Sequence, residues 1–242
     1  MNEKTNTFPR SERIEFLRYC LGKQDVKGLK ILDYGGNHGN LIKDGILDSS
    51  IAPKDYTCVD VDFSVLEESR KEIPDATWIY YNRYNQLYNP QGEKFIPLPF
   101  EDNTFDVAFS YSIHTHCSYE DFVFDLKELK RVAKTVITSY IDPEMGEFIK
   151  MKRTFDYGEN ELHPDWYKMN EIESYKYFID GDVVTSNEIP NNCDFLITVY
   201  NTNWLLDRHP EITRIVSCQE MKTPMNSYTQ PCIIIDEEEM CE

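Results

Sequence analysis

Three glycines follow an aspartate within the segment KILDYGGNHGNL, residues 30 to 41, in a chain that holds only ten glycines. An apolar run ends in Asp33, and the glycines that follow are Gly35, Gly36 and Gly39. Glycine lacks a Cβ and adopts positive φ angles freely, and Asn37 is a residue type that tolerates the left-handed region. Such a turn lets a ligand approach the backbone closely. A helix that begins near Asn40 would offer free N–H groups to an anionic group.

A carboxylate and two histidines are the other candidates for chemistry. Asp60 ends the apolar run YTCVD about twenty residues beyond the glycines, where an acidic side chain can accept hydrogen bonds from both ribose hydroxyls of a nucleotide. His114 and His116 follow the run FDVAFSYS and are candidates for a general base, or for bonding a neighbouring loop. Their side chains diverge if a strand continues through them, so one at most would face a reacting group. Tyr111 either orients a substrate or packs.

Elements in alternation must position these residues. Apolar runs predict strands at 29–34, 56–62, 76–81, 105–112 and 134–141. Helical periodicity predicts helices over 11–21, after each of the first two strands, and from Ser118 onward. Leu41, Ile42, Gly45 and Ile46 would form the inner stripe of the second helix, and Ser64 with Glu67 has capping-box spacing. The pattern predicts an α/β fold with a seven-stranded, mostly parallel, doubly wound sheet and helices on both faces.

The C-terminal part departs from this alternation. A helix around residues 201–209 leads to two apolar runs, 212–219 and 231–238, with no helix between them, so the sheet should end in an antiparallel hairpin strand. We expect a single domain over 1–242, with an N-terminal helix at about 10–22, a cofactor-binding half at about 27–141 and a C-terminal helix and hairpin at about 197–236. The aromatic-rich stretch of about 143–196 has no steady period and is expected to be an insertion or lid.

Composition limits the partners. The formal net charge of −18 disfavours nucleic acid, which is bound by neutralising phosphates with Lys and Arg. Seven scattered cysteines without a CxxC pair predict neither a disulfide framework nor a metal site. No leader, membrane-spanning run or low-complexity tract is evident in the sequence, so we expect a cytoplasmic protein that does not bind membranes. The oligomeric state cannot be read from the sequence.

Three motifs in order resemble those of class I S-adenosylmethionine-dependent methyltransferases. Asp33, Gly35 and Gly39 fit the family's Asp-x-Gly-x-Gly-x-Gly turn, with Asn37 in place of the middle glycine; a dinucleotide GxGxxG turn fits poorly. VDVD with the following LEESR is similar to the stretch after the family's second strand, and PLPFEDNTFDVAF is similar to its lead into the fourth strand. The resemblance covers about residues 27–141 and, more loosely, 197–236. It implies S-adenosyl-L-methionine as the cofactor.

The resemblance also implies roles for particular residues. Asp33 and the turn formed by Gly35, Gly36, Asn37 and Gly39 would support the methionine and ribose portions of the cofactor, Asp60 would bind the ribose hydroxyls, and Val61 would lie against the adenine. Ser110 and Tyr111 would face the methionine end and the acceptor. Where relatives have a short loop after the third strand, this chain has YYNRYNQLYNPQGEKFI, and Asn82 or Arg83 would take the place of the usual adenine contact.

Three functions remain open at this point. The first is methyl transfer to the oxygen or nitrogen of a small molecule, with carbon as a further acceptor atom. The second keeps the cofactor but makes the acceptor a peptide or protein side chain. The third is a non-catalytic cofactor-binding module, against which the ordered set of Asp33, Gly35, Gly39 and Asp60 argues. The Asn-Pro-Pro-aromatic and Pro-Cys motifs of DNA methyltransferases do not occur at the fourth strand.

Overall fold

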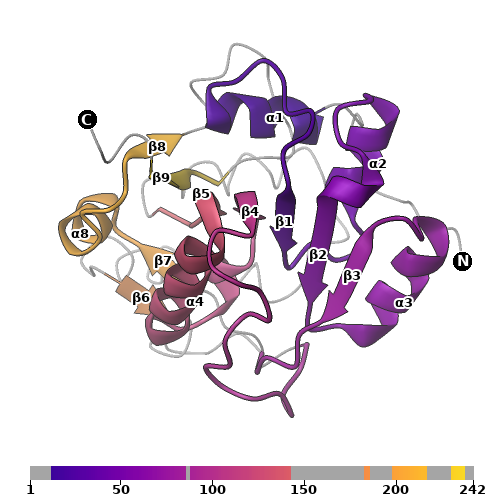
Figure 1. Ribbon diagram of the computed structural model, residues 1–242. Coiled ribbons are helices and arrows are strands. Elements are labelled where there is room, and N and C mark those ends of the chain that lie inside the picture. The colour runs from indigo at the N-terminus through magenta and orange to yellow at the C-terminus, as the bar shows by residue number, and fades with distance from the viewer. Residues whose placement is uncertain (1–11, 86–87, 143–182, 186–197, 217–229, 238–242) are drawn as a thin grey trace, which may run out of the picture.

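A single twisted sheet organises the described part of the chain. The computed structural model describes residues 12–85, 88–142, 183–185, 198–216 and 230–237. The seven strands of the sheet lie in the order β3-β2-β1-β4-β5-β9-β8 (Figure 1). Their bounds are β1 Ile31–Tyr34, β2 Tyr56–Asp60, β3 Thr77–Tyr80, β4 Phe105–Ser110, β5 Ala133–Ser139, β8 Arg214–Val216 and β9 Cys232–Asp236. This is the fold class that the sequence predicts.

The direction of the strands confirms the predicted C-terminal hairpin. Strands β1 to β5 pair in parallel, whereas β9 runs antiparallel to β5 and to β8. Because β1 and β4 are neighbours at the centre, the chain reverses the direction in which it adds strands between them. In open α/β sheets, ligands bind beyond the carboxyl ends of the strands at such a reversal point.

Alternating side chains of the central strands fill two cores, one on each face of the sheet. On β1, Ile31 belongs to one core and Leu32 to the other, and on β4 Phe109 and Ala108 are divided in the same way. Each strand is therefore apolar on both faces, as expected for a parallel sheet covered on both sides.

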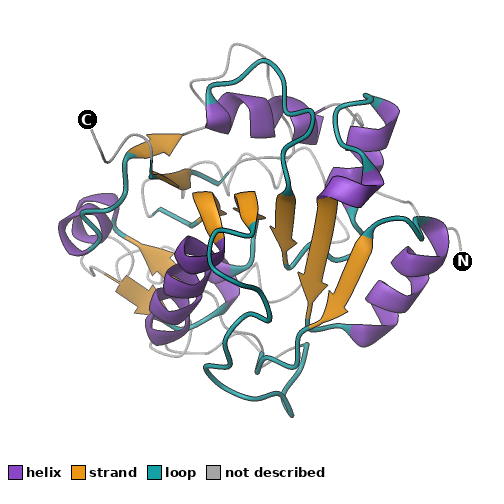
Figure 2. Ribbon diagram, viewed as in Figure 1, coloured by secondary structure: helices purple, strands orange, loops and turns teal. Residues whose placement is uncertain are grey.

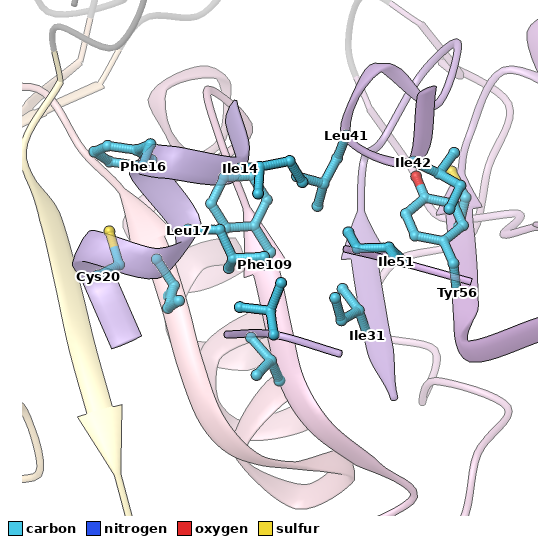
Figure 3. Packing of buried hydrophobic residues seen from close by; sticks show 14 of the residues in the cluster. Ile14, Phe16, Leu17, Cys20, Ile31, Leu41, Ile42, Ile51, Tyr56 and Phe109 are labelled. Carbon is cyan, nitrogen blue, oxygen red and sulfur yellow. The ribbon is translucent and has the colours of Figure 1, made fainter. Parts of the chain in front are cut away.

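Helices cover both faces (Figure 2). Helices α1 (Glu12–Leu21), α2 (Asn40–Leu47) and α3 (Phe63–Glu72) pack on the first core, in which Ile14 and Leu17 of α1 lie near Phe109 of β4 (Figure 3). Helices α4 (Tyr119–Val132) and α8 (Thr202–Arg208) contribute Phe122, Leu126, Leu129 and Leu205 to the second core. Two short 3-10 helices, η1 (Pro53–Asp55) and η2 (His114–His116), complete the helical elements of the described residues.

Helix starts follow local capping chemistry, with one correction to the sequence analysis. As predicted, Ser118 caps α4 by accepting a hydrogen bond from the N–H of Asp121. The expected capping box of Ser64 and Glu67 is wrong, because the cap of α3 is Asp62, whose carboxylate accepts from the N–H groups of Ser64 and Val65. An ionised carboxylate at a helix N-terminus also gains from the helix dipole, which favours Asp62 over a serine two residues later.

A second correction concerns the inner face of α2. Leu41, Ile42 and Gly45 are buried as expected, but Ile46 is 39% exposed and Asp44 takes the buried position. Asp44 is neutralised by Arg13 of α1, whose Nη1 lies 3.0 Å from its carboxylate. An ion pair thus joins α1 to α2 where the sequence pattern suggested an apolar contact.

The described residues of the connection from β3 to β4, 81–85 and 88–104, carry no helix. They belong to a long loop that lies beyond the carboxyl ends of β2 and β3 (Figure 1). The expected insertion at about 143–196 falls outside the described residues, apart from β6 (Val183–Thr185), which pairs antiparallel with β7 (Thr198–Tyr200). In the described part of the chain, no helix has the length and apolar character needed to cross a bilayer.

Candidate functional site

A cavity of about 310 Å³ lies at the carboxyl ends of the central strands. The ends of β1 and β2 contribute Gly35, Asn37, Asp60 and Val61, and the segment after β4 contributes Tyr111, Ser112, Ile113 and His116. The loop after β3 contributes Tyr81, Arg83, Tyr84, Asn85 and Tyr88, and α4 contributes Asp121 and Asp125. The cavity therefore occupies the reversal point of the sheet, where the topology predicts a ligand.

The glycine turn forms the part of the cavity wall next to β1. Gly35 and Gly39 have φ angles of 74° and 66°, and Asn37 has a φ of 50°, all in the left-handed region. Gly36 does not have the positive φ that the sequence analysis expected. It is required for close approach instead, because a Cβ there would lie 2.6 Å from Cγ of Asp33. Gly39 ends the turn as the N-cap of α2, so the helix begins at Asn40 as predicted.

Asp60 is fixed at the edge of this turn. Its Oδ2 accepts a hydrogen bond of 2.9 Å from the N–H of Asn37, and its Oδ1 accepts one of 2.9 Å from the N–H of Asp62. Burial raises the pKa of the Asp60 carboxyl, although the N–H groups of Asp62, Asn37 and Val61 oppose that shift. A carboxylate oxygen has more than one lone-pair site, so the group can still accept hydrogen bonds from a ligand in the cavity.

Asp33 lies beneath the turn and does not line the cavity. It is 5% exposed, and the Tyr56 hydroxyl donates to its Oδ2 at 2.5 Å. Burial raises the pKa of Asp33 to about 7, and the hydrogen bond from Tyr56 offsets part of that rise. Asp33 thus supports the turn from below, and any contact with a ligand would pass through the glycine turn.

The raised pKa of Asp33 predicts a specific dependence of stability on pH. A carboxyl group whose pKa is higher in the folded than in the unfolded state stabilises the fold at pH values below its unfolded-state pKa. That contribution is lost as the pH rises through the folded-state pKa. From an unfolded pKa of about 4 to a folded pKa of about 7, the loss amounts to about 4 kcal/mol. Asp33→Asn should remove this decrease of the free energy of unfolding with rising pH. Urea unfolding of both proteins between pH 4.5 and 7.5 measures it, and parallel pH profiles would contradict the assignment.

The segment after β4 separates the candidate catalytic residues. Tyr111 and His116 line the cavity, whereas Ser110 and His114 are fully buried and do not. The strand ends at Ser110 and turns through Ser112, which has a φ of 63°, into η2. His114 points into the fold, where its Nδ1 lies 2.6 Å from Oγ1 of Thr138 and its ring stacks on Tyr34. The two histidines diverge as expected, although through a 3-10 turn rather than a continued strand.

Tyr111 is held against the first core. Its ring stacks on Phe109 and meets Phe16 edge-on, and its hydroxyl accepts a 3.1 Å hydrogen bond from the N–H of Gln230. The tyrosine therefore presents a fixed edge to the cavity.

A buried ion cluster in the wall of the cavity was not predicted as a unit. Arg83 is 3% exposed; its Nε donates to Asp125 at 3.0 Å and its Nη2 donates to Asp121 at 3.0 Å. Burial alone would lower the pKa of Arg83, but the Asp125 and Asp121 carboxylates keep it above the ordinary value. The only signal in the sequence is the four-residue spacing of Asp121 and Asp125, which places them on one face of α4. Their common partner comes from a loop about forty residues earlier, at separations of 38 and 42.

Asn82, the alternative candidate beside Arg83, does not line the cavity. Its side-chain oxygen accepts hydrogen bonds from the Tyr80 hydroxyl at 3.0 Å and from Nδ2 of Asn89 at 3.2 Å. Asn82 thus ties the loop to the end of β3. Val61, by contrast, lines the cavity beside Asp60 as expected.

Comparisons with known proteins agree with this geometry. Residues 32–136 match a family model described as a methyltransferase domain. No curated protein matches the sequence. The PH0226 protein from Pyrococcus horikoshii OT3 is similar in structure, with a TM-score of 0.55 and 16% identity over 96% of this chain and 92% of that one. A candidate S-adenosyl-L-methionine-dependent methyltransferase from Methanococcus maripaludis has a TM-score of 0.50 and 16% identity over 95% of this chain and 85% of its own. At these identities the likeness shows a shared fold.

Proposed function

The chain is a class I S-adenosylmethionine-dependent methyltransferase, and we propose that it transfers the methyl group to a small molecule. The cavity carries the proposal. Its volume of about 310 Å³ lies within the range of pockets that enclose small ligands. Its wall includes residues of the loop after β3, of η2 and of α4.

The residues at the ends of β1 and β2 fit the cofactor. Gly35 leaves its part of the turn without a side chain, Asn37 continues the turn at a positive φ, and Asp60 offers carboxylate oxygens beside Val61. We assign the ribose hydroxyls to Asp60 and the adenine face to Val61. Asp33 and Gly36 hold this wall in place from behind, since the Gly36 backbone packs directly on the Asp33 carboxyl.

The chain has little bond chemistry to perform. The bound cofactor supplies a methyl group already activated as a sulfonium, so the protein must align the acceptor and exclude water. Tyr111, fixed by Gln230 and Phe109, is suited to orienting an acceptor. A hydroxyl or ammonium acceptor must also lose a proton, and His116 is the histidine of the pair that lines the cavity. His114, fully buried against Thr138, is assigned a structural role.

Two parts of the proposal concern the rest of the chain. Residues 1–242 are taken as one domain in which 143–196 form an insertion or lid near the ligand. A cytoplasmic location is retained from the sequence features alone.

The acceptor class can be tested by following the methyl group. The protein is incubated with methyl-labelled S-adenosylmethionine and either the dialysable small molecules or the retained proteins of one cell extract. Label should move into the small-molecule fraction, and Asp60→Ala should transfer none. Label found in the protein fraction alone would support the peptide or protein acceptor and overturn the small-molecule proposal.

A further inference from the structure

The cavity has an excess of negative charge in its walls. Its lining residues include three carboxylates, Asp60, Asp121 and Asp125, against one guanidinium, that of Arg83. With neutral histidines, the formal charge of the lining is therefore −2. Asp121 and Asp125 of α4 share Arg83 between them, and we call the part of the wall that they form the acidic end. That end alone keeps one uncompensated negative charge.

The contacts around this acidic end hold its charges in place. Asp121 accepts a 2.6 Å hydrogen bond from the Ser118 hydroxyl, and its exposed fraction is 9%. The guanidinium of Arg83 lies beside the packed ring pair of Phe95 and Phe124, 5.4 and 5.0 Å from their centroids. Side chains fixed in this way cannot turn out to water, so the local field acts on whatever group enters the cavity.

Aromatic rings form much of the remaining wall. Tyrosines at five positions line the cavity, namely Tyr34, Tyr81, Tyr84, Tyr88 and Tyr111. Tyr88 stands out because it is 57% exposed while the loop that carries it is tied down. Asn85 and Asn89 exchange backbone hydrogen bonds of 3.1 and 3.0 Å on either side of this tyrosine, and the Tyr84 N–H donates to the Glu93 carbonyl at 2.8 Å. Tyrosine faces attract flat rings and cations.

An unsatisfied polar atom points to a bound group at the same end. Nη1 of Arg83 is buried and has no hydrogen-bond partner among the described residues. Nε2 of His114 also lacks a hydrogen bond there, but it faces Oδ2 of Asp125 at 3.6 Å and His114 does not line the cavity. Buried polar atoms of this kind are normally paired, with a ligand or a water where the protein offers nothing. Because the two carboxylates already make this end negative, a neutral oxygen suits the Arg83 donor better than an anion does.

Resting on the proposed function, we infer that the acceptor is a small arylalkylamine, in which a protonated aliphatic amine is linked to an aromatic ring. Its positive charge lies against Asp121 and Asp125, and its ring lies against Tyr84 and Tyr88. Acceptors with a carboxylate or phosphate at the same position are disfavoured by the field of the two aspartates.

Three phenols that differ only in the charge of one group test the inference: tyramine, the neutral alcohol tyrosol, and 4-hydroxyphenylacetate. Their binding is measured by calorimetry at pH 8 with the protein saturated by S-adenosylhomocysteine, so that the cofactor site is filled and histidine is neutral. Tyramine should bind about tenfold more tightly than tyrosol, and 4-hydroxyphenylacetate should bind more weakly than either. Equal or tighter binding of the acid, or no binding of tyramine, would overturn the inference.

Two variants locate the charge that selects the amine. Asp121→Asn should reduce the preference for tyramine over tyrosol by about tenfold, whereas Glu68→Gln, at an exposed position on α3, makes the same change in net charge and should leave the preference intact. If Asp121→Asn does not fold, the ranking of the three phenols by the unaltered protein still decides the matter.

The affinity for S-adenosylhomocysteine separates the two proposals. Failure of this binding in the unaltered protein counts against the proposed function. Intact binding without a preference for the amine counts against the further inference alone. A loss of S-adenosylhomocysteine affinity in folded Asp121→Asn, with the phenol ranking unchanged, would place the cofactor at the acidic end and overturn the inference.

Discussion

Asp60→Ala should raise the Kd for S-adenosylmethionine by about a hundredfold or more. Two hydroxyl-to-carboxylate hydrogen bonds, each of about 1.5–3 kcal/mol, would be lost, and 3 kcal/mol already exceeds a factor of one hundred. The variant also releases the N–H of Asn37, which Asp60 holds at 2.9 Å, so the glycine turn would lose one of its fixed points. Calorimetric titration of both proteins measures the change.

Asp62→Ala is the matched control, because it removes a carboxylate two residues away. Asp62 caps α3 through the N–H groups of Ser64 and Val65, and its loss should cost about 1 kcal/mol of stability. The affinity for S-adenosylmethionine should stay within about threefold of the original, since Asp62 does not line the cavity. Asp60→Ala protein that binds the cofactor as tightly as the unaltered chain would remove Asp60 from the site.

Local patterns were enough to predict the sheet and its ligand-binding end. The apolar strands, the intervening helices and the helix-free C-terminal pair specify a doubly wound sheet with an antiparallel end, because each depends on periodicity within a few residues. The glycine turn and Asp60 could be placed for the same reason. If β1 and β2 are parallel neighbours, their carboxyl ends lie at the same edge of the sheet, so Asp60 at the end of β2 lies next to the turn after β1. The pairing of Tyr34 with Val59 confirms this register.

Contacts between distant segments could not be predicted in this way. Nothing near Ser110 signals that β4 ends there, so its side chain was expected at the cavity although it is fully buried. Because a 3-10 turn follows, His114 is buried in the fold whereas His116 lines the cavity. Arg83 meets Asp121 and Asp125 only because the loop after β3 crosses to α4, and no local rule fixes the path of a long loop.

The same cluster gives the largest expected effect on stability. Arg83→Met should lower the free energy of unfolding by about 3–5 kcal/mol at pH 8, because it leaves two buried carboxylates without their cation. Arg70→Met serves as the comparison. Arg70 of α3 pairs with Glu67 and donates to the Trp78 carbonyl at 2.7 Å, and the loss of both contacts costs about 1–2 kcal/mol. Urea unfolding of the three proteins measures both differences.

Neutralising the two carboxylates tests the cause of the Arg83→Met effect. Without Arg83, Asp121 and Asp125 are two like charges in a buried site, and each destabilises the other. Adding Asp121→Asn and Asp125→Asn to Arg83→Met should recover part of the lost stability. If the triple variant were no more stable than Arg83→Met, packing against Phe95 and Phe124 would be the main contribution of the arginine, and the charge that we assign to the acidic end would not govern the stability of this region.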